Sequence, residues 1–547
     1  MTTSLSKPTV HRHTLPADQR PPAIDGMRAA SRLKELEARA RREMEILGHN
    51  HDWVPDPSDG AYNVLIIGGG QAGLGAAFAL QRHRIGKVKI LDAAPADSIG
   101  CWSRYARMHT LRSPKNMKGI ELDVPSLHTE SWFRAKYGDE AWEHTTLVPR
   151  LDWHEYLEWY RTVTDADVDF ETEVTEVLPP SEPGGAFTVR ARRGGDGDGD
   201  GGSEGVEYRA QRVIFALGLD GGGGAFVPPL IRELPQKFWA HTEDMIDFSQ
   251  FEGRRVLVVG GGASGFDNAG TALEAGAESV TLFQRSAQVA TKNSLRWMEF
   301  PGMQERFFDL PDDKKWEFGL FNGGLPQPPT QASIWRAFAF DNFSFHEGTT
   351  IQSIEVISDG DAAGGTSGTE ELLVTDNHGD VTVVDFIISA TGYTVDLALR
   401  PELQEFVGDI QLWSDQYSPA AGHPMGKCPY LGDGFQFQPK AGAGADAETE
   451  AEAEVGVEAE AGADPAEYIP RLYHFSTGAR ASHGLAGNQL SGIYAGITRM
   501  SARIATDIMA ENWDDFFEDF KAFEHVEVTN VGRHKEGDPW YPQQPRY

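Results

Sequence analysis

One stretch, Asn63–Asp92, constrains the fold of this chain more than any other. It reads NVLIIGGGQAGLGAAFALQRHRIGKVKILD: an apolar run, a glycine-rich turn, a helical pattern and a second apolar run. The first run, Asn63–Ile67, has no polar face, as expected for a parallel strand buried on both sides. Gly68, Gly70 and Gly73 have the GxGxxG spacing, which allows a tight turn, close approach to a pyrophosphate and close packing of helix on strand. This order predicts a dinucleotide-binding βαβ unit.

Asp92 closes the second strand of that unit. A carboxylate in this position can accept hydrogen bonds from the hydroxyl groups of a ribose. A glycine-rich turn can also be a plain flexible loop. Here, however, strand, helix, second strand and terminal acid follow one another in the expected order, so the stretch predicts a nucleotide site.

A second unit of the same kind begins near the middle of the chain. Arg254–Val259 predicts a strand, Gly260, Gly262 and Gly265 repeat the GxGxxG spacing, and Ser279–Gln284 predicts the next strand. Alternating β-like stretches and a final apolar strand follow each unit. This repeated order predicts an α/β fold with two Rossmann-like, three-layer domains.

The length of 547 residues is too great for a single core, which agrees with several domains. We expect an N-terminal extension, 1–60, that holds one helix and is partly disordered. The first nucleotide domain is expected to be discontinuous, formed by 61–225 and 381–547, with the second domain inserted as 226–380. The acidic Ala/Glu/Gly segment 441–466 is expected to be a disordered insertion.

The helix expected at 24–47 is rich in Arg and Glu. A surface helix is the simplest interpretation of such a pattern. An oligomer contact is the alternative, so a homo-oligomer stays open.

Charge and hydropathy limit the partners. The net charge of −33 argues against nucleic acid and anionic membranes. No apolar run approaches the ~18 residues of a membrane span, and the N-terminal region lacks a secretory hydrophobic stretch, so we expect a cytoplasmic protein. The stretch 196–207 formally fits a calcium-loop pattern, but its flanks read as strands. We interpret it as a hairpin tip and expect no metal site.

The two units end differently, which indicates two different nucleotides. Asp92 suits a free ribose diol, whereas Arg285 takes the place of the acid in the second unit. A guanidinium suits a 2′-phosphate and favours NADPH there; a solvated arginine at a strand end is the alternative. Because a flavin activates oxygen and nicotinamide does not readily do so, FAD is the economical partner at the first site.

The chain has only two cysteines, Cys101 and Cys428, which are far apart in sequence. A disulfide reductase needs a redox cysteine pair beside its flavin, and the chain has none. Molecular oxygen is then the leading electron acceptor, through a flavin C4a-(hydro)peroxide.

With these motifs together, the chain resembles the class B flavoprotein monooxygenases, which include flavin-containing, Baeyer–Villiger and N-hydroxylating enzymes. The resemblance covers roughly Tyr62–Met509 and rests on the order GxGxxG, acid, G-x-W, second GxGxS-G, Arg-Ser and ATGY. It implies FAD on the first glycine motif, NADPH on the second, and an NADPH domain inserted into the FAD domain. Carried over by position, it implies cofactor contacts at Gly68, Gly70, Gly73, Asp92, Trp102, Gly260, Gly262, Ser264, Gly265, Arg285, Thr391 and Gly392.

Two family motifs are incomplete. The usual GG-x-W has Cys101 in place of its second glycine, and the F-x-G-x-x-x-H-S motif survives only as Phe238–Thr242. Within it, His241 fits either a linker near both cofactors or an ordinary surface histidine. These departures leave the subclass open.

Two further segments are expected near the flavin. Lys115 and Asn116 lie where related enzymes place polar residues beside the isoalloxazine, so they are candidate catalytic contacts; a simple proline turn is the alternative. The loop before the last helix contributes Gly484, Asn488 and Gln489, because the N-terminal dipole of that helix favours negative charge on a reduced flavin.

The sequence thus predicts an FAD- and NADPH-dependent monooxygenase that oxygenates a small amine, sulfide or ketone. One alternative is an FAD-dependent NADPH oxidase or reductase that inserts no oxygen. Another is a non-catalytic nucleotide-binding regulator.

Overall fold

The structure is a computed structural model, and it describes residues 26–49, 51–194, 204–358, 370–419, 422–442, 463–487, 489–526, 528 and 531–537. Most of the acidic segment 441–466 lies outside the described residues. So do 195–203, at the expected hairpin tip, and the first half of the N-terminal extension.

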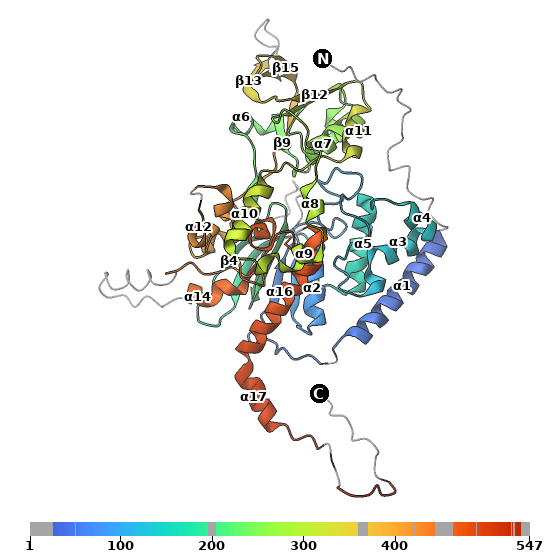
Figure 1. Ribbon diagram of the computed structural model, residues 1–547, viewed down its shortest axis with the longest axis vertical. Coiled ribbons are helices and arrows are strands. Elements are labelled where there is room, and N and C mark those ends of the chain that lie inside the picture. The colour runs from blue at the N-terminus through green and yellow to red at the C-terminus, as the bar shows by residue number, and fades with distance from the viewer. Residues whose placement is uncertain are drawn as a thin grey trace, which may run out of the picture.

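A parallel sheet forms the centre of the first domain. Its order is β18-β7-β1-β2-β3, with β1 Val64–Ile67, β2 Val88–Leu91, β3 Val168–Asp169, β7 Val213–Gly218 and β18 Leu472–Ser476. Every residue of β1 is buried, as its lack of a polar face predicted. Helix α2, Gln71–Arg82, follows β1 and lies beside the long helix α16, Leu490–Glu511 (Figure 1).

The second domain is built on a parallel sheet of its own. Its order is β12-β11-β10-β16-β9, with β9 Trp239–His241, β10 Arg255–Val259, β11 Ser279–Gln284, β12 Phe343–Glu347 and β16 Phe386–Ser389. Helix α7, Ala263–Glu274, follows β10 and packs against α11, Gln331–Phe338. The predicted α/β class with two Rossmann-like sheets is therefore confirmed.

Each domain also carries an antiparallel meander of three strands. These are β4 Thr172–Leu178, β5 Phe187–Arg193 and β6 Glu204–Ala210 in the first domain, and β13 Ile351–Ser358, β14 Glu370–Asp376 and β15 Val381–Val384 in the second. β5 pairs antiparallel with β6, so the strands expected on either side of the calcium-like stretch are confirmed.

Two short strands connect the domains. β8, Gly223–Ala225, leaves the first domain, and β17, Tyr393–Val395, returns to it; the two pair antiparallel. The boundary expected at 381 is too early, because β15 pairs with β14 and β16 pairs with β10 in the second domain. Residues 381–389 thus belong to the second domain.

The N-terminal helix α1, Gly26–Leu47, confirms the helix expected at 24–47, and it is part of the folded body. Leu36 and Ala40 are buried in the main core. Arg41 pairs with Asp165 at 2.5 Å. In Figure 1 the helix lies along the outside of α3 and α5, so its inner face is already covered within one chain.

The remaining helices lie around the two sheets, except for α17, which projects away from the body beyond α16 (Figure 1). They are α3 Thr129–Tyr137, α4 Asp139–His144, α5 Arg150–Val163, α6 Pro229–Arg232, α8 Ser294–Trp297, α9 Pro301–Arg306, α10 Asp312–Gly323, α12 Trp413–Gln416, α14 Pro465–Tyr468, α15 Arg480–His483 and α17 Trp513–Ala522. The aromatic face of α5 is buried, so it serves the core.

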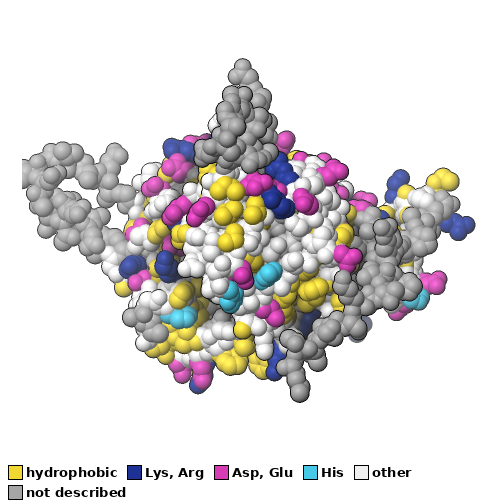
Figure 2. Space-filling model, turned by 90° about the horizontal axis from the view of Figure 1, so that it is seen from above, with side chains coloured by type: hydrophobic (Ala, Val, Ile, Leu, Met, Phe, Trp, Pro, Cys, Tyr) yellow, Lys and Arg dark blue, Asp and Glu magenta, His cyan; other side chains and the backbone are white. Residues whose placement is uncertain are grey.

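No helix among the described residues is long and apolar enough to cross a membrane. Seen from above the second domain, acidic and basic side chains alternate with separate hydrophobic patches, and no extended basic area gathers on the described part of this face (Figure 2).

Candidate active site

A cavity of about 850 Å³ opens where the carboxyl ends of the first sheet face the second domain. Its walls come from the loops after β1, β2 and β7, from the polar segment between β2 and α3, and from the starts of α7 and α16. Ligand cavities commonly measure about 300–1,000 Å³ and form between domains. This cavity is therefore the candidate active site.

The first glycine turn forms one wall. Gly68 has φ +105°, and a Cβ added to it would lie 2.5 Å from the Ala216 oxygen; one added to Gly73 would lie 1.9 Å from the Gly68 oxygen. Gly70, by contrast, would meet only the Gly100 Cα, at 3.7 Å, and it lines the cavity. The outer glycines thus serve the turn and the packing, whereas the middle one leaves room for a phosphate at the start of α2.

Asp92 lies beside this turn and lines the cavity. Its carboxylate accepts hydrogen bonds from the backbone N–H of Gly69 at 2.5 Å and of Ala94 at 2.7 Å. Burial raises the pKa of Asp92, an effect that these hydrogen bonds and the nearby Arg104 oppose. The residues present fit an adenosine ribose and pyrophosphate, with Arg104 available for phosphate oxygens.

The second glycine turn has the same geometry. Gly260 has φ +122° and its added Cβ would lie 2.2 Å from the Ala390 oxygen, while one added to Gly265 would lie 1.8 Å from the Gly260 oxygen. An added Cβ on Gly262 would meet nothing within 4 Å. Ser264 is exposed in the first turn of α7. This turn too leaves open space at its middle glycine.

Strand register corrects the position given to Arg285. Phe283 pairs with Val259 as Leu91 pairs with Ile67, so Gln284 is the structural counterpart of Asp92. A Cβ added to Gly261 would lie 2.2 Å from the Gln284 amide oxygen, as one on Gly69 would meet Asp92. Arg285 is the next residue, exposed and without a partner among the described residues. Sequence spacing could have identified Gln284, because both residues follow the third glycine by the same interval.

Lys115 and Asn116 do not line the cavity. The ammonium of Lys115 donates to the Trp142 oxygen at 2.5 Å and lies 4.6 Å from the Trp142 ring centre. Asn116 is exposed. Arg112 and Ser113 take the place expected for them in the cavity wall, so the structure gives no support to a role of Lys115 and Asn116 at the reacting atoms.

Trp102 lines the cavity, and its ring meets that of Trp153 edge-on with centres 6.3 Å apart. Gln489 lines it at the start of α16 and makes no side-chain cap, so the first N–H groups of that helix remain available to a ligand. Gly484 lies outside, where its φ is +63° and an added Cβ would meet Phe307 at 3.2 Å. Asn488 is outside the described residues.

Thr391, Gly392 and His241 lie beside the connection between the domains and do not line the cavity. The Thr391 hydroxyl donates to the Phe226 oxygen, and Gly392 has φ +79° with open space around it. His241 is buried, with its ring edge-on to Tyr393 at 5.5 Å, so the surface interpretation is wrong. Burial lowers the pKa of His241.

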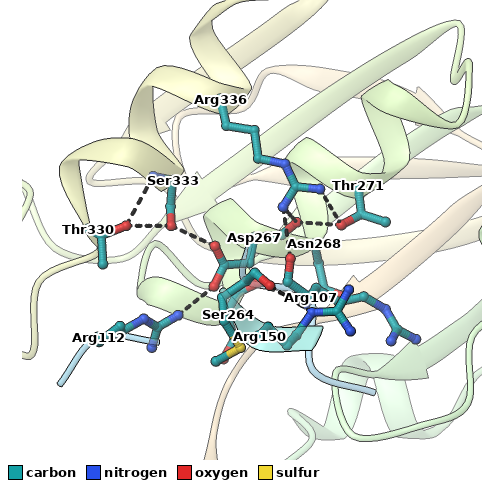
Figure 3. A network of polar contacts seen from close by, with 11 residues as sticks. Arg107, Arg112, Arg150, Ser264, Asp267, Asn268, Thr271, Thr330, Ser333 and Arg336 are labelled. Atoms are coloured by element: carbon teal, nitrogen blue, oxygen red, sulfur yellow. Dashed lines mark hydrogen bonds and ion pairs between the residues drawn. The ribbon is translucent and has the colours of Figure 1, made fainter. Parts of the chain in front are cut away.

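A polar network joins the two domains behind the cavity (Figure 3). The buried carboxylate of Asp267 on α7 pairs with Arg112 from the first domain and accepts a hydrogen bond from Ser333 on α11 at 2.6 Å. Arg336 of α11 donates to the Arg107 oxygen of the first domain at 2.8 Å. These contacts fix the cavity wall at Arg112 against the start of the second nucleotide site.

Five arginines line the cavity, and none of them was among the predicted site residues. Three are neutralised: Arg112 by Asp267, Arg296 by Glu299 at 3.1 Å, and Arg400 by Asp220 at 3.1 Å and Glu402 at 2.7 Å. Arg104 and Arg480 have no ion pair or hydrogen bond with the part of the chain that the structure describes. Among the described residues no cluster suits a metal ion.

Comparison with known sequences now identifies the family. The model of the pyridine nucleotide-disulphide oxidoreductases matches residues 65–315. The FAD-dependent urate hydroxylase of Xanthomonas campestris pv. campestris is 32% identical over 514 residues, which cover 91% of this chain and 97% of that protein. The chain belongs to the family of this hydroxylase.

Solved structures share the fold. Ornithine hydroxylase from Pseudomonas aeruginosa has a TM-score of 0.59 at 15% identity, over 82% of this chain and 99% of that one. L-lysine 6-monooxygenase from Pseudomonas syringae has a TM-score of 0.55 at 16% identity, over the same shares. Membership of this family makes the chain an oxidoreductase. Its two cysteines are free, and burial raises the pKa of the cavity-lining Cys101 to about 11, so it is not a redox thiolate.

Proposed function

We propose that the chain is an FAD- and NADPH-dependent monooxygenase, with FAD at the first glycine turn and NADPH at the second. The observation that carries this proposal is the pair of turns in which the middle glycine alone faces open space, on two domains that meet at one cavity. The relative, which is described as FAD-dependent, supports the assignment of the first nucleotide.

Bound FAD would supply the redox chemistry, by taking hydride from NADPH and activating oxygen when reduced. The chain's own residues would bind and orient the two cofactors. Asp92 and Arg104 suit the ribose and phosphates of FAD, and the uncapped start of α16 at Gln489 favours negative charge on the reduced ring. Arg285 suits the 2′-phosphate of NADPH.

The substrate is a small organic molecule that receives one oxygen atom. The relative's name favours urate, or a similar oxygen-rich nitrogen heterocycle, over the amine, sulfide or ketone expected from the resemblance. We propose the domain limits 61–225 and 390–547 for FAD and 226–389 for NADPH, from the strand pairing described above.

The test measures NADPH consumption, oxygenated product and hydrogen peroxide with the FAD-loaded protein, for urate, an amine, a sulfide and a ketone. We expect one substrate class to yield about one product per NADPH with little peroxide. Peroxide formation without any product would establish the oxidase alternative. A purified chain that takes up no FAD would establish the non-catalytic alternative.

A further inference from the structure

The cavity contains a half-buried cation, Arg480, that has no partner among the described residues. Arg480 begins α15, directly after the turn that follows β18, and its side chain lines the cavity. The guanidinium Nε has no solvent-exposed surface and no hydrogen-bond partner. No ion pair or hydrogen bond joins the Arg480 side chain to the described residues, in contrast to the paired Arg112, Arg296 and Arg400.

Within the described part of the chain, no carboxylate pairs with Arg480. The titratable group that acts on its guanidinium is the thiol of Cys428. Burial raises the pKa of that thiol to about 12, so the thiol is neutral near pH 7. Trp413 and Ala481 pack around the same thiol, which keeps this side of the arginine apolar.

Partial burial of an unpaired guanidinium is costly, because it removes water from the Nε and returns no partner. Burial lowers the pKa of Arg480, yet an arginine stays charged at physiological pH. An anion that binds in the cavity would therefore stabilise this unpaired charge strongly. The planar fork of an arginine suits an anion that is spread over two oxygen or nitrogen atoms.

Under the proposed function the cofactors would have other partners. The phosphates of the first nucleotide would meet Gly70, the start of α2 and Arg104, which lines the cavity. Those of the second nucleotide would meet Gly262 and Arg285. The reduced flavin ring would face the start of α16, at Gln489–Ser491. Resting on the function proposed above, we propose that Arg480 binds the substrate, and that it selects a small delocalised organic anion over a neutral molecule of the same size.

Calorimetric titration of the FAD-loaded protein tests this without turnover. The anionic probe is urate, and the neutral probe is caffeine, a purine of similar shape without an acidic proton. We expect Arg480→Gln to weaken urate binding at least thirtyfold and Arg480→Lys to weaken it less, while caffeine binding stays weak and unchanged. Arg306→Gln, on the exposed side of α9 and outside the cavity, is the matched control and should change nothing.

Three results would overturn the proposal. In one, Arg480→Gln binds urate as tightly as the unchanged protein. In another, the unchanged protein binds caffeine as well as urate. In the third, Arg480→Gln loses FAD or its rate of reduction by NADPH while urate affinity is kept, which would assign Arg480 to the cofactor. Melting temperature checks that each variant folds, and the charge-retaining Arg480→Lys remains informative if Arg480→Gln does not fold.

Failure of the proposed function gives a different result. A chain that takes up no FAD, or never consumes NADPH, would contradict that function. Urate can still be titrated into the flavin-free protein. The proposal for Arg480 then stands if the unchanged protein binds urate at least thirtyfold more tightly than the Arg480→Gln variant, and it falls if the two bind equally.

Discussion

Asp92 and Gln284 occupy the same structural position in the two nucleotide sites, and they differ by one charge. The Asp92 carboxylate accepts from the Gly69 N–H, whereas the Gln284 side chain lies over Gly261. A carboxylate would repel a 2′-phosphate, and an amide does not. For binding of a 2′-phosphate, the replacement of the acid by Gln284 therefore matters as much as the exposed Arg285 that follows it.

Arg285→Ala should raise KM for NADPH about tenfold or more and leave KM for NADH almost unchanged. The reason is that a hydrogen bond to a charged group contributes about 1.5–3 kcal/mol. Steady-state kinetics with both dinucleotides measure the difference. Arg254→Ala removes an exposed arginine before β10 and should affect neither. Equal losses with both dinucleotides would remove the case for a 2′-phosphate contact.

The raised pKa of Glu243 leads us to expect that the stability of the fold depends on pH. Burial, Asp220 and Asp244 raise the pKa of Glu243 to about 7. The folded chain then holds the proton more tightly than the unfolded chain does, so stability is highest at acid pH and falls as the pH rises through about 7. We expect the melting temperature to decline from about pH 5 to about pH 8, and Glu243→Gln to reduce this decline.

Thermal melts over that pH range measure the effect. Glu233→Gln, at an exposed position of the same domain, should leave the profile unchanged. A profile that is the same with and without Glu243 would show that another group titrates.

At the scale of elements, the turn between β10 and α7 contains one glycine that leaves space for a ligand and another that the packing of the turn requires. A Cβ on Gly262 would enter open space, whereas one on Gly265 would lie 1.8 Å from the Gly260 oxygen. Gly262→Ala should therefore keep the melting temperature and weaken NADPH binding by about tenfold or more, because the added methyl group meets the pyrophosphate. Gly265→Ala should lower the melting temperature by several degrees.

Calorimetric titration of NADP⁺ and thermal melts distinguish the two variants. Gly253→Ala is no suitable control, because its φ of +69° would strain a side chain. Gly323→Ala at the end of α10, where an added Cβ meets nothing, serves instead. If Gly262→Ala binds NADP⁺ normally, no phosphate approaches that glycine.

The elements that sequence predicts best are those with local periodicity. Both βαβ units, the α5 core face and helix α1 follow from patterns of neighbouring residues. The boundary expected at 381 was wrong because β16, an apolar strand, was assigned to the first domain. In the structure β16 pairs with β10 of the second domain, and β7 is the strand that pairs with β1. The second sheet is complete with β16 before the chain returns, whereas the first sheet gains β18 only after that return.

Asp92, Trp102 and Gln489 of the cavity wall were predicted, whereas its arginines were not, because tertiary contacts bring them together. Arg112 and Arg480 come from segments without periodicity that are far apart in sequence, and only the docking of the domains brings them to one cavity. Lys115 was predicted to lie near the flavin from its position along the chain. A turn of only a few residues directs its side chain to Trp142 instead.

For the molecule as a whole, Asp267 couples the two domains. Asp267→Asn keeps the shape but removes the charge that pairs with Arg112. We expect the melting temperature to fall and the rate of flavin reduction by bound NADPH to drop by between about tenfold and a hundredfold, because small misplacements are costly at a reacting centre. Affinity for NADPH should change little, since Asp267 does not line the cavity.

Stopped-flow reduction at saturating NADPH gives that rate. Asp313→Asn removes an exposed acid on α10 and is the control. An unchanged reduction rate in Asp267→Asn would mean that the network supports folding alone.

The paired strands β8 and β17 have a consequence for how such an enzyme can diversify. Ala225 lies directly opposite Tyr393, so the chain leaves and re-enters the first domain at one place. A recombination event at the codons of these two residues would exchange the second domain as one unit and leave the strand order of the first sheet unchanged. A lineage could in this way acquire a different reductant while it keeps its oxidation chemistry.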